Sequence, residues 1–167
     1  MTPLQHAACG RHGAGWYDVA GTELRRWSAA NGFAPERVAD VLAVTSPQVP
    51  VSRNVSLTVQ YLTTGATDGM LPSVIVALGK LPRIDGPKTG AFRDALLGDT
   101  EAVVLDVWMG RAFGEDAVLR GRRYATYARR VAFIGRLTGM TPAGAQAAIW
   151  TSVRASHGYK PVDVVFP

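Results

Sequence analysis

The sequence has few of the side chains that hold metals and disulfides. Its 167 residues include one cysteine, Cys9, and three histidines. A single cysteine excludes a disulfide framework and a thiolate cage for zinc or an iron–sulfur cluster. The histidines do not follow HExxH or a similar metal-binding spacing. We therefore expect no metal site and no other cofactor.

Long apolar runs are also missing. No stretch of about 18 uninterrupted apolar residues occurs, which argues against a membrane-spanning helix. The first residues, MTPLQHAACGRHGAG, lack the charged start and apolar stretch of a secretion signal. The sequence thus predicts a cytoplasmic protein without a membrane partner, and it does not indicate an oligomeric state.

The chain has the size of one ordinary domain. Hydrophobic residues make up 47% of it, which is enough to bury a core. No internal repeat or low-complexity tract divides it. We expect a single domain over residues 1–167.

Hydrophobic periodicity predicts an all-α fold of seven or so helices with little sheet. Several segments begin with Pro in the first turn and end at Gly or Asn. Residues 52–65 are ambiguous, because Val55, Leu57 and Val59 alternate as in a strand, and Ser52 as an N-cap favours a helix. Residues before 15 are expected to be loose, and residues 159–167 to form an extended tail. The predicted helical segments are 15–31, 35–46, 52–65, 72–81, 89–97, 107–114, 124–137 and 142–158.

Positive charge is concentrated in one segment. The formal net charge is +5, and residues 117–139 contain six arginines and no acid. Guanidinium groups match phosphate oxygens, which favours binding to nucleic acid. The alternative is a solvated helix face in a basic protein, and both interpretations stay open. The six are Arg120, Arg122, Arg123, Arg129, Arg130 and Arg136.

The stretch IDGPKTGAFRDALLGDTEAVVLD, residues 84–106, places an amine and a carboxylate at the two ends of a helix and loop. Lys88 follows a Gly-Pro turn, and Asp106 lies 18 positions further on, before VWMGRAFG. With apolar segments on both sides, the turn predicts a helix-hairpin-helix near residues 78–97, whose amides around Gly86 can hold a phosphate oxygen. Asp106 is also the natural N-cap of the next helix, and a lysine at a helix start is often an ordinary surface residue.

The order of these features resembles the helix-hairpin-helix (HhH-GPD) DNA glycosylase superfamily. In that family a hairpin of the form LPGVGxKT precedes a VD(T/V)HxxR segment, and the interval from lysine to aspartate is the same. The resemblance spans about residues 41–114. It implies that Lys88 is the Schiff-base lysine and Asp106 the catalytic aspartate, and that Gly86, Thr89 and Arg111 contact DNA.

The resemblance also covers the stretch VLAVTSPQVPVSRN, which is similar to an LLSAQATDVSVNKA-like helix and loop. In glycosylases this loop enters the gap left by the flipped base, which implies DNA contacts for Thr45, Gln48 and Asn54. The wider layout, including a late QAxxW, resembles a divergent branch found in actinobacterial phages. Some relatives of that group are associated with thymine hypermodification as amino acid:DNA transferases.

Three positions depart from the family pattern. Ile84 and Asp85 occupy the places of the usual hairpin Gly and Val, and an acid there would repel a phosphate. Trp108 stands where the family has a histidine. The large aromatic residues, including Trp16, Tyr17, Trp27 and Trp150, are expected to be core residues rather than platforms for bases. Gln146 is expected to be an ordinary helix residue.

The resemblance implies a DNA base-processing enzyme of the glycosylase/AP-lyase type, whose partner is double-stranded DNA with an extruded base. A carboxylate near C1′ would stabilise the sugar cation, and an amine of lowered pKa would form an imine. This requires Lys88 and Asp106 to face one pocket that admits a nucleobase. A transferase acting on the same base, a non-catalytic module that binds phosphates through Arg122, Arg123, Arg129 and Arg130, and a role without nucleic acid stay open.

Overall fold

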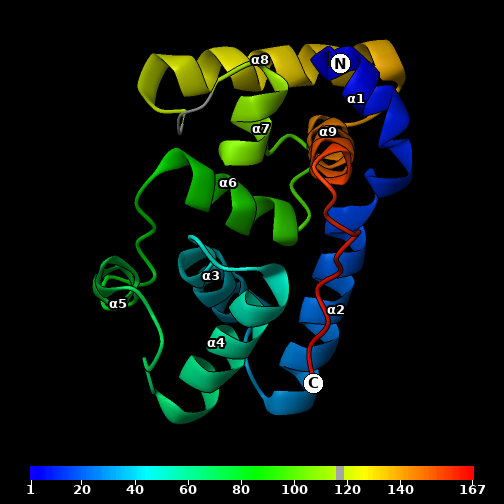
Figure 1. The fold of residues 1–167 in the computed structure, drawn as a ribbon. Helices are drawn as coiled ribbons and strands as arrows, with labels where there is room; N and C mark the ends of the chain where they lie inside the picture. Colours follow the sequence, from blue (N-terminus) through cyan, green and yellow to red (C-terminus); the bar gives the residue numbers. More distant parts are fainter. Residues whose placement is uncertain (116–118) are drawn as a thin grey trace.

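A computed structural model describes residues 1–115 and 119–167, and all regular secondary structure in these ranges is helical (Figure 1). The all-α expectation is therefore confirmed. The elements are α1 (Pro3–Cys9), a 3₁₀ turn η1 (Arg11–Gly13), α2 (Trp16–Asn31), α3 (Pro35–Thr45), α4 (Val51–Thr64), α5 (Pro72–Leu78), α6 (Pro87–Leu96), α7 (Val107–Ala112), α8 (Gly121–Thr138) and α9 (Pro142–Ser156).

Local signals mark most helix ends. Thr141 caps α9, because its hydroxyl accepts a hydrogen bond from Gly144 N at 3.0 Å, and Pro142 occupies the first turn. Helices α2 and α8 end at Gly32 and Gly139, whose φ angles of 71° and 67° lie in the left-handed region that favours glycine. Residues 52–65, whose pattern was ambiguous, lie almost entirely in the helix α4. This helix packs against α3, and its buried residues follow a helical stripe: Asn54, Val55, Leu57 and Thr58.

The start of the chain is ordered, contrary to expectation. Thr2 and Gln5 form a capping box for α1, which packs against α9. His6 is buried and its Nδ1 lies 3.0 Å from Ser152 Oγ. A Cβ at Gly10 would lie 1.9 Å from the carbonyl oxygen of Ala148, so only glycine allows this close approach.

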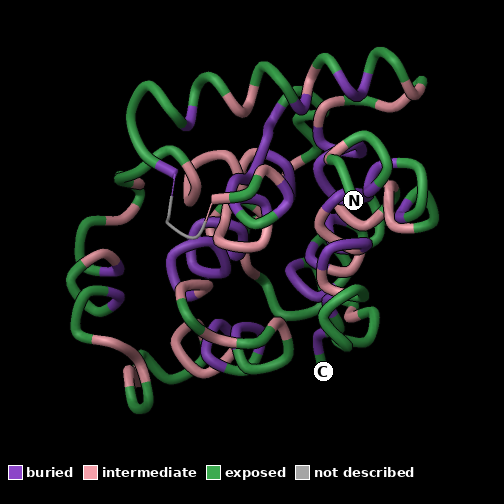
Figure 2. The backbone as a smooth tube through the Cα atoms, turned by 45° about the horizontal axis from the view of Figure 1, so that its top comes forward, coloured by how far each residue is buried: buried purple, intermediate pink, exposed green. Residues whose placement is uncertain are grey.

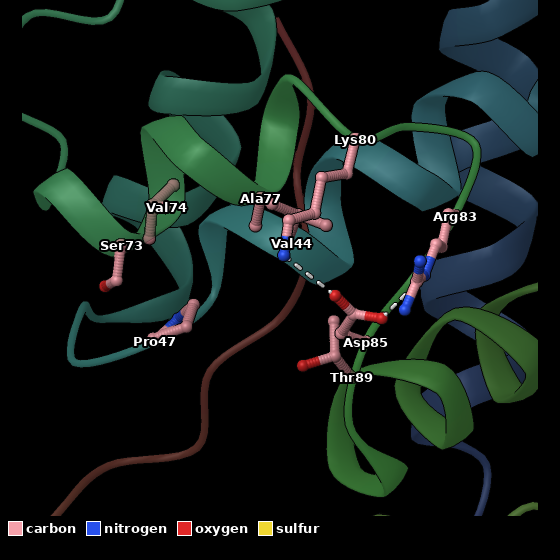
Figure 3. A pocket seen from close by; sticks show the side chains of 9 residues that line it. All are labelled: Val44, Pro47, Ser73, Val74, Ala77, Lys80, Arg83, Asp85 and Thr89. Atoms are coloured by element: carbon pink, nitrogen blue, oxygen red, sulfur yellow. Dashed lines mark hydrogen bonds and ion pairs between the residues drawn. The ribbon is translucent and has the colours of Figure 1, made fainter.

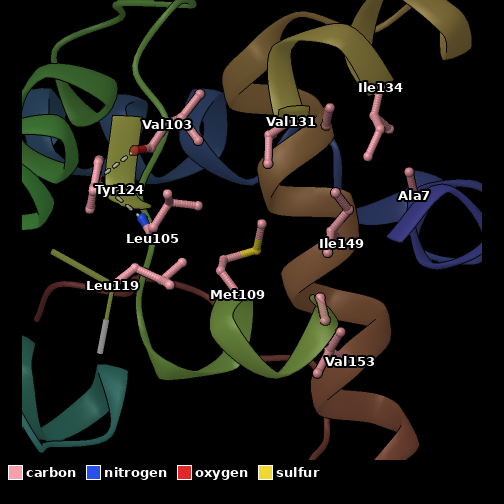
Figure 4. Packing of buried hydrophobic residues seen from close by; sticks show 12 residues of the cluster. Ala7, Val103, Leu105, Met109, Leu119, Tyr124, Val131, Ile134, Ile149 and Val153 are labelled. Atoms are coloured by element: carbon pink, nitrogen blue, oxygen red, sulfur yellow. Dashed lines mark hydrogen bonds between the residues drawn. The ribbon is translucent and has the colours of Figure 1, made fainter. Parts of the chain in front are cut away.

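Two large hydrophobic clusters hold the helices together. One lies among α1, α7, α8 and α9, where Met109 and Leu105 face Ile149 and Val153 (Figure 4). The other joins α2, α3 and the C-terminal tail, which runs beside α2 as an extended chain (Figure 1). Phe166 of the tail stacks on Trp27 with ring centroids 5.2 Å apart.

Helix α8 lies at the surface, with most of its residues exposed (Figure 2). Its buried positions are Tyr124, Val131, Ile134 and Gly135, and the arginines occupy the other sides. Across the described ranges, the helices lack the combination of length and apolar character needed to cross a bilayer.

Candidate functional site

Helices α5 and α6 flank the loop of residues 79–86, so the first helix ends at Leu78 and not at residue 81 as expected. Gly86 precedes α6 with φ 94° and ψ 139°, a conformation that favours glycine, and Pro87 occupies the first helical position. Lys88 and Thr89 therefore lie in the first turn of α6, directly behind the loop.

The acid in this loop is neutralised by its neighbours. Asp85 accepts hydrogen bonds from Lys80 Nζ and Arg83 Nε, both at 3.0 Å, and these bonds hold the pKa of Asp85 below its usual value (Figure 3). Two cations facing one carboxylate leave the loop with an excess of positive charge, which offsets the repulsion expected between Asp85 and a phosphate. The three side chains line an open pocket of about 160 Å³ with Val44, Pro47, Ser73, Val74, Ala77 and Thr89.

Lys88 is half-buried and has a neutral hydrogen-bond partner. Its Nζ donates to Ser46 Oγ at 2.9 Å and lies 5.7 Å from the centroid of the Phe92 ring. Burial lowers the pKa of Lys88, and the negative charge of Asp106 partly opposes that shift. Among the ion pairs of the described residues, none includes Lys88.

Asp106 caps α7, as the sequence predicts. Its Oδ1 accepts a hydrogen bond from Met109 N at 3.0 Å, and its Oδ2 accepts one from Trp150 Nε1 at 3.0 Å. The carboxylate is thus fixed by the first turn of α7 and by α9. Trp150 was not expected to contact a site residue.

Tyr124 of α8 ties together the backbone segments that precede Lys88 and Asp106. Its hydroxyl donates to Val103 O at 2.7 Å, lies 3.3 Å from Pro87 O, and accepts from Leu105 N at 3.2 Å. Burial raises the pKa of Tyr124 to about 12, so the hydroxyl stays protonated near neutral pH. The tie holds the start of α6 against the segment that leads into α7.

Aromatic residues surround the same region. Tyr17 donates to Oε1 of the buried Gln146 at 2.7 Å, and its pKa is raised well above its usual value, first by burial and then by Asp106. The Phe92 ring lies 6.3 Å from that of Tyr17 and 6.3 Å from that of Trp16. Trp27 is a core residue as expected, whereas Trp16, Tyr17, Trp108 and Trp150 are only partly buried.

Lys88 and Asp106 therefore share one electrostatic neighbourhood without forming an ion pair. Neither Lys88 nor Asp106 lines the pocket beside the loop, and neither lines a second pocket formed by α2, α9 and the C-terminal tail. The base-sized cleft expected between the two side chains is not one of these pockets.

Two of the three residues predicted to reach into DNA point inward. Thr45 is 1% and Asn54 4% exposed, and Thr45 Oγ1 lies 2.6 Å from Asn54 Oδ1 and 3.0 Å from Thr58 Oγ1. Asn54 Nδ2 donates to Leu42 O at 3.0 Å. These side chains join α3 to α4 and do not reach the surface, so the prediction of DNA contacts for them is withdrawn. Gln48 is exposed in the loop between the two helices, with φ 60°.

The predicted arginines are exposed but differ in their partners. Arg123 forms an ion pair with Glu115, and Arg130 stacks over Phe113 and Tyr127 at 5.2 and 5.3 Å. Arg111 stacks over Trp108 at 4.4 Å. Arg122 and Arg129, which share one side of α8, form none of the ion pairs or cation–π contacts of the described ranges.

Sequence reasoning missed Ser46 and Trp150 as partners of Lys88 and Asp106, and it missed Tyr17 and Tyr124, which hold neighbouring groups. Only the QAxxW pattern held a signal, because Gln146 and Trp150 are four residues apart and so share a face of α9. No group of three or more His, Cys, Asp and Glu side chains within residues 1–115 and 119–167 is arranged to hold a metal ion.

The fold and these contacts define an all-α protein with a partly buried lysine behind a helix–loop–helix and an aspartate that caps the next helix. The chain matches the family model DUF7178, described as a family of unknown function, over residues 5–157, and it belongs to that family. No curated protein and no solved structure matches it. The match includes every candidate residue and leaves out the last ten residues of the tail.

Proposed function

We propose that the protein is a DNA base-processing enzyme that acts on an extruded nucleotide in the manner of a glycosylase and AP lyase. One observation carries the proposal. The amine of Lys88, whose pKa is lowered by burial, lies within the electrostatic reach of the Asp106 carboxylate and directly behind the Gly86 turn. A partly buried amine that lacks an ion-pair partner and feels the charge of a fixed carboxylate is typical of a reactive site.

The two side chains suit the two halves of the reaction. A lowered pKa leaves more of the Lys88 amine neutral, and the neutral nitrogen can attack C1′ as the bond from C1′ to the base breaks. The base leaves with the electron pair and takes up a proton. Asp106 stabilises the positive charge that develops on the sugar. Loss of a proton from the nitrogen and opening of the sugar ring then yield the imine.

Exposed cations supply contacts for the DNA backbone. Arg122 and Arg129 of α8 face solvent, and Tyr124 ties the first part of α8 to the start of α6. We assign phosphate contacts to these arginines, with Gly86 and Thr89 at the loop and Arg111 on α7. Because neither pocket is lined by Lys88, the proposal requires the bond from Lys88 to Ser46 to open when a base enters.

Borohydride trapping tests the proposal. Duplexes that contain an abasic site, uracil or a 5-substituted pyrimidine are incubated with the protein and borohydride. We expect a covalent complex that Lys88→Ala abolishes. Lys160→Ala is the matched control, because Lys160 is an exposed lysine of the C-terminal tail, and it should still form the complex. If the wild-type protein forms no complex with any of these duplexes, the lyase mechanism is wrong. A new mass on the base would instead indicate the transferase.

A second candidate is a non-catalytic DNA-binding module. It is favoured by the contacts of Lys88 and Asp106, because each side chain has hydrogen-bond partners that would also serve a purely structural role. This candidate predicts DNA binding that weakens steeply with salt and leaves the DNA unchanged. Product formation by the wild-type protein that Asp106→Asn removes would exclude it.

A further inference from the structure

A second pocket lies apart from Lys88 and Asp106, between the start of α2, the end of α9 and the C-terminal tail. These three segments lie beside one another in Figure 1. The pocket has a volume of about 260 Å³, near the lower end of the roughly 300–1,000 Å³ typical of ligand pockets. Its lining residues are His12, Gly13, Gly15, Trp16, Val19, Trp150, Thr151, Arg154, Lys160, Pro161, Val162 and Asp163.

Among the described residues, Arg154 in this pocket finds no acceptor for its side-chain donors. Its Nε is buried without a hydrogen-bond partner, and the ion pairs of the described residues do not include it. The guanidinium carbon lies 4.4 Å from the centroid of the Trp150 ring and 5.5 Å from that of Tyr159. Burial lowers the pKa of Arg154. A buried guanidinium N–H without a hydrogen-bond partner is costly, and an anion held by the other N–H groups would offset part of that cost through its charge.

The rest of the lining adds charge and flat apolar surface. Lys160 adds a second cation and Asp163 one acid, so the charged groups carry a net positive charge. The indole N–H of Trp16 donates to Val162 O at 2.7 Å, and that of Trp150 donates to Asp106 Oδ2 at 3.0 Å. Both donors are already used, so the indoles offer ring faces and edges to the pocket rather than hydrogen bonds.

We propose that this pocket binds a small organic anion, whose carboxylate or phosphate group is held by Arg154 and Lys160 and whose flat ring packs on Trp16 and Trp150. A guanidinium fork matches both kinds of oxyanion. The volume suits a small molecule and not a polymer. The site does not rest on the proposed action on DNA, although Trp150 touches both the pocket and Asp106.

Calorimetric titration of the full chain without DNA tests this site. The probes are benzoate and thymidine 5′-monophosphate, each paired with a neutral counterpart, benzamide and thymidine, and inorganic phosphate alone. We expect saturable binding of benzoate, of the monophosphate or of both, with the neutral counterpart at least about tenfold weaker. Which of the two binds more tightly tells a carboxylate site from a phosphate site. Phosphate alone should bind more weakly than the ring-bearing anion.

Matched variants locate the binding. Arg154→Gln should weaken the anion by about tenfold or more, and Lys160→Gln, on the exposed tail, by a smaller factor. Arg25→Gln removes an exposed arginine outside the pocket and should bind as the wild type does. If Arg154→Gln unfolds, as circular dichroism would reveal, Arg154→Lys and Lys160→Gln take its place.

Three results would overturn the site. They are the absence of saturable binding for both ring-bearing anions, equal binding of the charged and neutral probes, and unchanged affinity in the Arg154 and Lys160 variants. Because DNA is absent from every titration, these outcomes are independent of the trapping experiment.

Discussion

Two polar clusters connect helices in this molecule, and they are built in opposite ways. Between α3 and α4, Thr45, Asn54 and Thr58 are neutral, buried and hydrogen-bonded to one another. Among α6, α7 and α9, Lys88 and Asp106 carry charge, yet each is held by neutral partners and not by the other. In the first cluster the polar side chains satisfy one another. In the second, the described residues provide no ion-pair partner for either charged group.

This difference in pairing gives a criterion for distinguishing a structural polar group from a candidate functional one. A closed network of neutral hydrogen bonds repays the cost of burying its members. Keeping a charged amine partly buried without an ion-pair partner costs free energy. The lowered pKa of Lys88 reflects this cost, because burial disfavours the charged form. That cost is the physical reason to look for chemistry at Lys88 and not at Thr45. Four changes test the contrast.

The largest effect is expected for Asp106→Asn. Asparagine caps a helix nearly as well as aspartate, so the fold should persist, but the charge that stabilises the sugar cation is lost. We expect product formation in single-turnover assays to fall by about a hundredfold or more. Asp99→Asn, at an exposed loop carboxylate, should retain activity. Wild-type rates for Asp106→Asn would show that both clusters are structural.

Asn54→Ala should have the opposite effect to Asp106→Asn, because it should lower stability and leave DNA binding unchanged. It removes one hydrogen-bond partner from Thr45 and one from Leu42 O within the core, so the free energy of unfolding should fall by about 2 kcal/mol. Urea denaturation measures the loss. Affinity for DNA, measured where the variant is folded, should not change, because the Asn54 side chain is buried. A specific loss of DNA binding in the folded variant would restore Asn54 to the interface.

The arginines of α8 should separate into two pairs. Arg122→Gln with Arg129→Gln should weaken DNA binding by about tenfold at moderate salt and reduce the slope of log K against log salt by about 2. Arg123→Gln with Arg130→Gln should change the slope less, because these side chains already contact Glu115, Phe113 and Tyr127. Fluorescence anisotropy across a salt series gives both slopes, and equal slopes in the two double variants would contradict the assignment.

The smallest effect is a pH dependence of stability. The pKa of Lys88 is lower in the folded state than the 10.5 of a free lysine, so between the two values the unfolded chain binds more protons. The contribution of Lys88 to the free energy of unfolding should therefore rise with pH across that window. Lys88→Met removes this rise, and Lys80→Met, at an exposed lysine, keeps it. Urea denaturation at several alkaline pH values measures the difference, which would be zero if burial does not perturb Lys88.

Much of the helical framework was predictable, because its signals are local. The N-cap role of Asp106, the turn at Gly86 and the helix starts at Pro35, Pro72 and Pro142 depend on neighbours within one turn. Helix α1 was missed although Thr2 and Gln5 give a local capping signal, because the helix has only seven residues and its packing partner, Ser152, lies 146 positions from His6.

The candidate site was predictable only in part. The residues of the motif, Lys88 and Asp106, were identified from their order along the chain. Their partners Ser46 and Trp150 are 42 and 44 positions away, and nothing in the local sequence indicates such contacts. Thr45 and Asn54 were assigned to a DNA interface by the family resemblance, and the local sequence does not show whether such polar side chains face solvent or the core.

The sequence by itself determined an all-helical chain, the ends of most helices and the arginine-rich face of α8, because propensity, capping and periodicity act over one or two turns. Only the tertiary structure decided which polar groups find partners. It closed the Thr45 and Asn54 network, neutralised Asp85, gave Lys88 the neutral partner Ser46 and left the buried Nε of Arg154 without a hydrogen-bond partner among the described residues. Burial and pairing depend on which distant helices pack together, and that packing is a property of the whole chain.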